Sequence, residues 1–145
     1  MRTLIAAAAS INLLAACGSA PLAPYQPPVA GSKARIKFYD DANGVSATIA
    51  ASARCSDIRA APTWRWLDVP AGSRVYVRHS NSTGYPGSTC GISFSFVPEE
   101  GASYISDLKE KIIYCTFEQW RQTEENGEKL RIPTLHKESG CKPDE

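Results

Sequence analysis

Apolar and polar residues alternate along much of this chain with a period of two, and this pattern predicts β-strands with one buried face. The alternating runs are found at 34–39, 45–50, 64–69, 74–79, 90–96, 103–108, 112–120 and 129–132. Turn-forming residues separate the runs every 8–12 residues or so, and no run has the period of an amphipathic helix. The sequence therefore predicts an all-β fold, an antiparallel β-sandwich of about seven short strands.

The clearest strand lies at Cys90–Phe96, where the even-numbered positions are mostly apolar and two serines occupy odd-numbered positions. Asn43-Gly44 separates the first two runs, and this dipeptide favours a tight hairpin because both residues tolerate positive φ. We expect residues 60–63 to form a loop, because Pro62 interrupts a hydrogen-bonded ladder.

Two groups of side chains are candidates for a binding surface. Trp64 and Trp66 are predicted to share a strand face and are suited to stacking on a sugar or a peptide, although such a pair more often packs in a core or at a half-covered edge. Arg74, Tyr76 and Arg78 form the outward row of the next strand. Such a row is either a contact face or an ordinary solvated face.

The N-terminus has the organisation of an exported lipoprotein. Met1-Arg2 supplies a positive charge, and the apolar run at 4–16 is shorter than the roughly 20 residues that a membrane-spanning helix needs. Leu14-Ala15-Ala16-Cys17 resembles the lipobox of bacterial lipoproteins. The resemblance implies that residues 1–16 are a signal peptide and that Cys17 becomes the acylated N-terminus.

This resemblance also implies a location. No aspartate follows Cys17, a pattern that implies sorting to the outer membrane with the domain facing the periplasm. Acyl chains contribute about 0.8 kcal/mol per buried methylene, so the lipid anchor is the expected membrane contact. Residues 17–32 are proline-rich and predict a semi-rigid linker with a reach of roughly 45 Å, and residues 33–145 form the predicted β-sandwich domain.

The charge balance and the cysteine spacing limit the kinds of partner and metal that the protein is expected to bind. The chain has 16 basic and 15 acidic residues, and removal of Arg2 with the signal balances them. Without a basic patch, nucleic acid is not an expected partner. The spacing of the cysteines and the lack of a nearby histidine pair argue against zinc, and we expect no metal and no cofactor.

The four remaining cysteines of this exported domain predict two disulfides; they are Cys55, Cys90, Cys115 and Cys141. If the strands at 90–97, 103–108 and 112–120 form a meander, Cys115 lies roughly 20 Å along the strand from Cys90. A bridge needs Cα atoms within about 7 Å. We therefore expect the pairs Cys55–Cys90 and Cys115–Cys141.

Catalytic chemistry has few candidate residues. His79 and His136 are the only histidines, and no G-x-S-x-G motif is present. A nucleophilic site needs a hydroxyl or thiol beside a base and a third group that orients the base. We expect no enzymatic activity; a hydrolase that uses His79 beside its serine-rich loop is the enzymatic hypothesis left open.

The segment from Val69 to Cys115 resembles small bacterial lipoproteins of uncharacterised function. The matching motifs are V-P-A-G at 69–72, C-x-x-S-F-S-F-x-P-E-x-G at 90–101, Tyr104 and Cys115. The resemblance implies an immunoglobulin- or transthyretin-like sandwich and no catalytic residues. The expected function is non-enzymatic binding or assembly with an envelope protein or polymer. The alternative is inhibition of an envelope-attacking hydrolase such as lysozyme, through the loop at 80–89.

Overall fold

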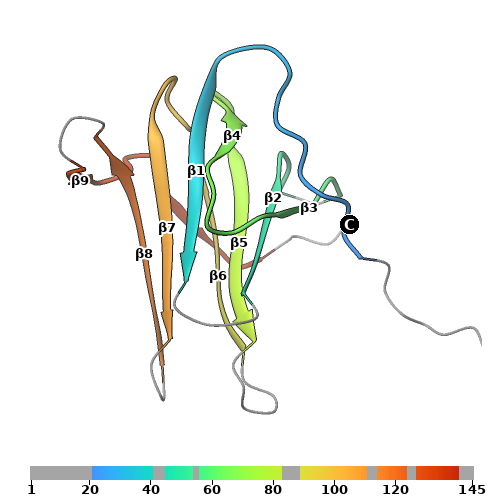
Figure 1. The fold of residues 1–145 in the computed structure, drawn as a ribbon, viewed down its shortest axis with the longest axis vertical. Coiled ribbons are helices and arrows are strands. Elements are labelled where there is room, and N and C mark those ends of the chain that lie inside the picture. The colour runs from blue at the N-terminus through green and yellow to red at the C-terminus, as the bar shows by residue number, and fades with distance from the viewer. Residues whose placement is uncertain are drawn as a thin grey trace, which may run out of the picture.

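The computed structural model describes residues 21–40, 45–53, 56–82, 89–110, 114–123 and 127–140, which form two five-stranded sheets and no helix. One sheet, called here the β1 sheet, has the order β4 (Leu67–Pro70), β1 (Lys33–Asp40), β7 (Ser103–Glu110), β8 (Cys115–Gln122) and β9 (Lys129–Leu130). The other, the β5 sheet, has the order β10 (His136–Glu138), β6 (Thr89–Phe96), β5 (Val75–Ser82), β2 (Val45–Ala50) and β3 (Arg59–Ala61). Figure 1 shows the long strands of both sheets aligned along a common axis. The predicted all-β, sandwich-like architecture is confirmed.

The strand boundaries follow the alternation in most places and depart from it in three. Arg59–Ala61 pairs with β2, although a loop was predicted over 60–63. β4 begins only at Leu67, so Trp64 and Trp66 lie outside it and do not share a strand face, contrary to the prediction. His136–Glu138 pairs with β6, in a segment that was predicted to be a tail. These strands have three or four residues, too few for a period of two to stand out in the sequence.

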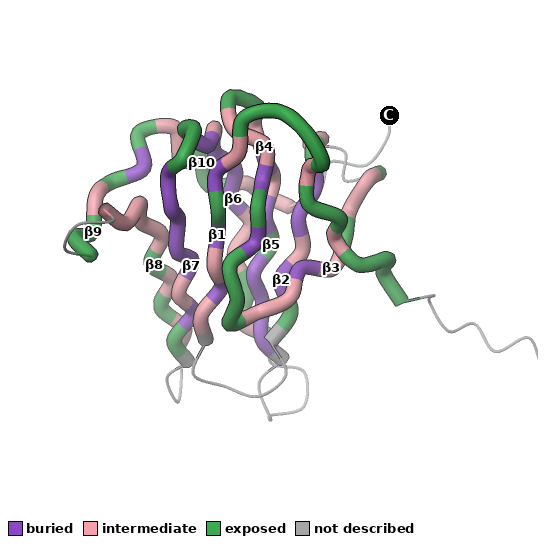
Figure 2. The backbone as a smooth tube through the Cα atoms, turned by 45° about the horizontal axis from the view of Figure 1, so that its top comes forward, coloured by how far each residue is buried: buried purple, intermediate pink, exposed green. Residues whose placement is uncertain are grey.

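Apolar side chains from both sheets fill the space between them. Phe38, Phe94, Phe96 and Tyr104 are each at most 2 % exposed, and the ring centroids of Phe96 and Tyr104 lie 4.7 Å apart across the two sheets. Figure 2 shows buried positions alternating with less buried ones along the strands. The tyrosine hydroxyl accepts a hydrogen bond from the backbone N–H of Glu99 at 2.9 Å, so its polar end is satisfied.

The segment between β6 and β7 carries the chain from one sheet to the other. The backbone N–H of Gly101 donates to Lys33 O at 2.8 Å, and that of Arg35 donates to Ala102 O at 3.0 Å. Gly101 has a φ of 72°, which favours glycine. These bonds direct β7 to the edge of β1, where it pairs in parallel, instead of back along β6.

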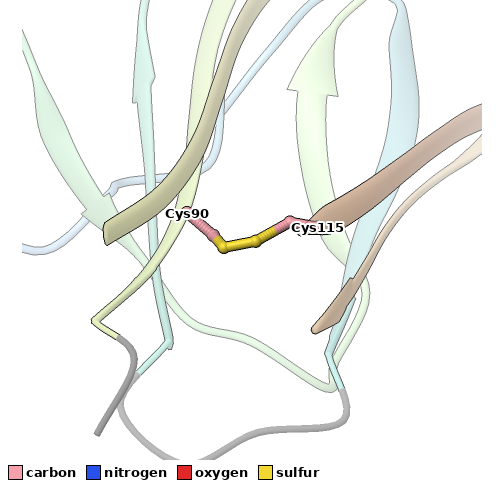
Figure 3. The surroundings of a disulfide bond; sticks show 2 residues. All are labelled: Cys90 and Cys115. Atoms are coloured by element: carbon pink, nitrogen blue, oxygen red, sulfur yellow. A yellow bond between two sulfur atoms is a disulfide. The ribbon is translucent and has the colours of Figure 1, made fainter. Parts of the chain in front are cut away.

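The observed disulfide overturns the predicted pairs. Cys90 and Cys115 form a disulfide (Figure 3), and their Cα atoms lie 6.1 Å apart. The predicted meander placed β6 beside β7 in one sheet, which is wrong, and its offset of roughly 20 Å ignored that β7 reverses the chain, so that β6 and β8 begin at the same end. Cys90 lies near the start of β6, and Cys115 pairs with Glu110 at the end of β7, so both cysteines lie at the same end of the sandwich. The predicted pairs Cys55–Cys90 and Cys115–Cys141 are therefore wrong; Cys55 and Cys141 themselves lie outside the described residues.

The N-terminal segment lies against the domain from Ala23 onward. The N–H of Tyr25 donates to Ala60 O at 2.8 Å, and the N–H of Ala60 donates to Ala23 O at 2.9 Å. Tyr25 packs against the core, and its burial raises the pKa of the phenol. This contact shortens the predicted spacer, because residues 17–22 reach only about 19 Å when extended. The signal peptide and Cys17 lie outside the described residues.

We expect the Cys90–Cys115 disulfide to contribute to stability. It closes a loop with a sequence separation of 25, for which the chain-entropy estimate is about 3.5 kcal/mol. The paired substitution Cys90→Ser and Cys115→Ser should lower the free energy of unfolding by that order, measured by urea denaturation. A non-reduced proteolytic map should contain a Cys90–Cys115 peptide; a map that contains Cys55–Cys90 instead would contradict the assignment.

Candidate binding face on the outer side of the β1 sheet

The outer face of the β1 sheet carries all three tryptophans of the chain. In β1 the even-numbered residues 34, 36 and 38 fill the core, so Arg35, Lys37 and Tyr39 point to the other side. Lys37 pairs with Ile105 of β7, and Ile105 pairs with Trp120 of β8. The register therefore forms one row across three neighbouring strands.

Trp64 and Trp66 extend this row from the connection between β3 and β4. The N–H of Trp64 donates to Phe38 O at 2.9 Å, which holds the connection against β1. The Trp64 ring meets Tyr39 edge-on, with centroids 5.1 Å apart. Trp64 and Trp66 are 55 % and 37 % exposed, so both present ring surface to solvent instead of packing in the core.

The backbone of Trp64 is strained. Its φ is 65°, in the left-handed region that side-chain-bearing residues avoid. Residues held in such sparsely populated conformations cost about 1–3 kcal/mol and tend to cluster at functional sites. The strain supports a functional reason for holding this aromatic ring on the surface.

Cations lie over the aromatic rings of the face. The Arg35 guanidinium is 4.8 Å from the centroid of the Trp66 ring, and its Nε donates to Ser103 Oγ at 2.7 Å. Lys37 Nζ lies 4.5 Å from the Tyr39 centroid and 5.9 Å from that of Trp66. Cation–π contacts of this kind contribute about 0.5–1 kcal/mol at exposed sites. They hold both positive groups at defined positions.

A matching pair lies at the other side of the row. Lys129 Nζ is 3.9 Å from the Trp120 centroid and 2.9 Å from Glu118 Oε2. The hydrogen bond and charge of Lys129 hold the pKa of the Glu118 carboxyl below its usual range. The pair keeps the ammonium over the indole ring.

A recess of about 190 Å³ opens beside Trp66. Its lining combines one aromatic ring, one guanidinium and several hydrogen-bonding side chains: Arg35, Trp66, Ser103, Gln122, Thr123 and Gly127. A ligand on the row of tryptophans therefore meets donors and acceptors along one side.

Sequence reasoning missed three members of this face. Arg35 and Lys37 alternate with the apolar Ile36 and Phe38, and Trp120 is out of phase with the predicted inward positions Cys115 and Phe117. Parity alone therefore indicated that they point outward. That they share one face with Trp66 follows only from the order of the strands.

The second predicted group lies on the other side of the molecule. Arg74 precedes β5, and Tyr76 and Arg78 lie within it, in the β5 sheet. Arg74 donates to Ser95 Oγ at 2.9 Å and to Thr134 O at 3.4 Å, so it holds the segment that leads to β10. The predicted surface of five residues is thus divided between two opposite faces, and the tryptophans belong to the richer one.

His79 is enclosed between the sheets. Its side chain is 0 % exposed, its Nδ1 shares a 3.0 Å hydrogen bond with Ser106 Oγ, and its ring meets Phe38 edge-on at 5.4 Å. Burial lowers the pKa of His79 to about 4. The imidazole does not face solvent, so in this structure it is not placed to act on a substrate. Residues 83–88 of the adjoining loop lie outside the described residues.

In the part of the chain that the structure describes, no three His, Cys, Asp or Glu side chains gather closely enough to hold a metal ion. Over the same residues, no helix is long and apolar enough to cross a membrane.

Comparisons with known proteins find no relatives. No protein-family model, no curated protein and no solved structure matches this chain.

The enclosed histidine predicts a pH dependence of stability. The folded pKa of about 4 lies below the unfolded value of 6.5, so the unfolded chain binds the proton more readily. The His79 contribution is complete above pH 6.5 and is lost as the pH falls toward 4. Between pH 7 and pH 5 we expect a loss of about 2 kcal/mol from this group.

Urea denaturation across this range measures that loss. The variant His79→Gln should show a shallower decline of stability with falling pH than the unmodified protein, because its buried side chain does not titrate. Equal slopes for the two proteins would contradict the assignment of this proton to His79.

Proposed function

We propose that this chain is a non-enzymatic, lipid-anchored protein of the cell envelope that binds an envelope protein or polymer through the outer face of the β1 sheet. The observation that carries the proposal is the gathering of Trp64, Trp66 and Trp120 on that one face, with cations held against Trp66 and Trp120. Exposed aromatic residues beside arginine are typical of binding surfaces that dominate affinity.

The anchor and the binding face are compatible in this arrangement. The lipobox resemblance places the lipid on Cys17 in the outer membrane, with the domain facing the periplasm. The described chain from Ala23 to Tyr25 runs beside β3, at the edge of the β5 sheet. In Figure 1 this blue segment lies on the side away from β8 and β9. The tether therefore leaves the tryptophan row open to a partner.

We propose the transthyretin-like alternative for the specific fold. In an immunoglobulin constant domain the first strand pairs with the second inside one sheet. Here β1 pairs with β4 and β7, and β2 lies in the other sheet. The central orders β4-β1-β7-β8 and β3-β2-β5-β6, with β1 parallel to β7, correspond to the connectivity of transthyretin-like sandwiches.

We also propose a second disulfide, between Cys55 and Cys141. With Cys90 and Cys115 paired, these two remain of the four cysteines expected in the exported domain. Their described neighbours Ile58 and Gly140 line the same pocket on the β5 sheet. The described segments that adjoin these two cysteines in the sequence therefore lie near each other.

Mass spectrometry of the non-reduced protein tests this pairing. We expect a Cys55–Cys141 peptide that disappears on reduction, beside the Cys90–Cys115 peptide. Free thiols at both positions, detected by alkylation of the unfolded but unreduced chain, would exclude the second disulfide.

A crosslinked pull-down from envelopes tests the proposed function. The unmodified lipidated protein should capture a stoichiometric partner. The double variant Trp66→Ala with Trp120→Ala should reduce the captured amount at least tenfold, because it removes two of the three indole rings of this face. The pair Tyr76→Ala with Arg78→Ala is the matched control on the β5 sheet and should retain the partner. The variant Cys17→Ala should lose the partner through loss of the anchor.

The control variant makes the result decisive. Equal capture by the tryptophan variant and the unmodified protein would remove the β1 face from the proposal. Capture that depends only on Tyr76 and Arg78 would move the binding surface to the β5 sheet.

A further inference from the structure

We infer that the ligand of the tryptophan row is an acidic polysaccharide whose charges are carboxylates. The inference rests on the proposed function, because it names the class of ligand for the same face. Its support comes from the spacing of the rings, from the position of the cations and from the polar lining of the recess.

The row is long and flat. Trp66 immediately precedes Leu67, which pairs with Ile36, so it lies across from Lys37; Ile105 and Trp120 continue the row. Three strand separations make the distance between the two tryptophan positions about 14 Å. A single sugar ring is too short to contact both tryptophans, whereas an extended chain of such units is long enough to do so.

The middle of the row is positively charged. Three lysines of the same sheet face are ion-paired with carboxylates, in the pairs Lys33–Asp68, Lys109–Asp107 and Lys129–Glu118. Lys37 forms no ion pair with a described residue and lies between Tyr39 and Trp66. The Arg35 guanidinium is oriented by Ser103 Oγ beside the same ring. Two fixed cations next to an exposed aromatic ring complement an anion that is attached to a flat ring.

Carboxylate is the anion that we assign. An arginine fork matches the geometry of a carboxylate, and lysine adds a compact positive charge beside it. Gln122 and Thr123 line the recess, and side chains of these types donate hydrogen bonds to hydroxyl groups and accept hydrogen bonds from them. Sugar acids carry all three complementary features: C–H faces that stack on indole rings, hydroxyls along their edges and one carboxylate on each unit.

The same observations disfavour two other partners. The centre of a protein–protein interface is depleted of charged residues, but here Lys37 lies at the centre of the row. A lipid surface calls for apolar side chains that insert, and Ile105, the aliphatic residue of the row, is only 5 % exposed. A protein partner and a lipid surface are therefore the less favoured alternatives.

Isothermal titration calorimetry of the full lipidated protein in neutral detergent micelles tests the inference with oligogalacturonate as the probe. We expect saturable binding that weakens with added salt. Trp66→Ala and Lys37→Gln should each weaken it at least tenfold, and Arg78→Gln, the matched control on the β5 sheet, should leave it unchanged. A neutral cello-oligosaccharide of equal length should bind at least tenfold more weakly.

Several results would overturn the inference. They are absence of binding, equal binding of the neutral oligosaccharide, binding that the Trp66 and Lys37 variants leave intact, and equally strong competition by inorganic polyphosphate, a polyanion without sugar rings. If the pull-down partner still depends on Trp66 and Trp120 while oligogalacturonate does not bind, the ligand class is wrong and the binding face stands. If the partner does not depend on these tryptophans, the proposed function fails as well.

Discussion

The parallel pairing of β1 with β7 is the constraint on which the rest of the structure depends. It places the first strand in the interior of a sheet that is otherwise built from β4 and from the C-terminal strands. The backbone bonds of Gly101 and Ala102 to β1 guide this pairing. Because β1 lies between β4 and β7, its outward cations stand between Trp66 and Trp120. Without this pair the tryptophans belong to separate surfaces, and no continuous face exists.

The alternation in the sequence located most strands, but it did not show which strands lie next to each other in a sheet. Alternation located β1, β2, β5 and β6 closely, because half-buried strands carry a period of two. Strand order depends on crossings between sheets, and a turn such as that at Gly101 has the same local sequence whether the chain returns along β6 or crosses to β1. The disulfide prediction failed on strand direction: β6 and β8 begin at the same end of the sandwich, so Cys90 and Cys115 are not separated along the strands as the offset of roughly 20 Å assumed.

The candidate site shows the same limit. Trp64 and Trp66 stood out as residues, and parity placed Lys37 and Trp120 on outward faces, but a shared face requires the register of four strands. The alternation that placed Arg74, Tyr76 and Arg78 outward also placed His79 on the inward side of the strand, so its burial could have been predicted. His79 ends a predicted strand beside a polar loop, a position typical of a surface, yet it fills an inward position against Phe38 and Ser106. His79 is therefore a buried polar group and not a candidate base, and its protonation at low pH destabilises the folded state.

The contact of the N-terminal segment with β3 has a mechanical consequence. If the proposed lipid on Cys17 and the proposed ligand on the β1 sheet both hold the domain, the chain between the two attachments carries tension. On the N-terminal side this load first reaches the two backbone bonds between Ala60 and the segment Ala23–Tyr25. Two bonds at the edge of a sheet separate more easily than the longer ladder that joins β1 to β7. Under that load the segment would come away from β3 and extend the reach of the domain, and both sheets would stay intact.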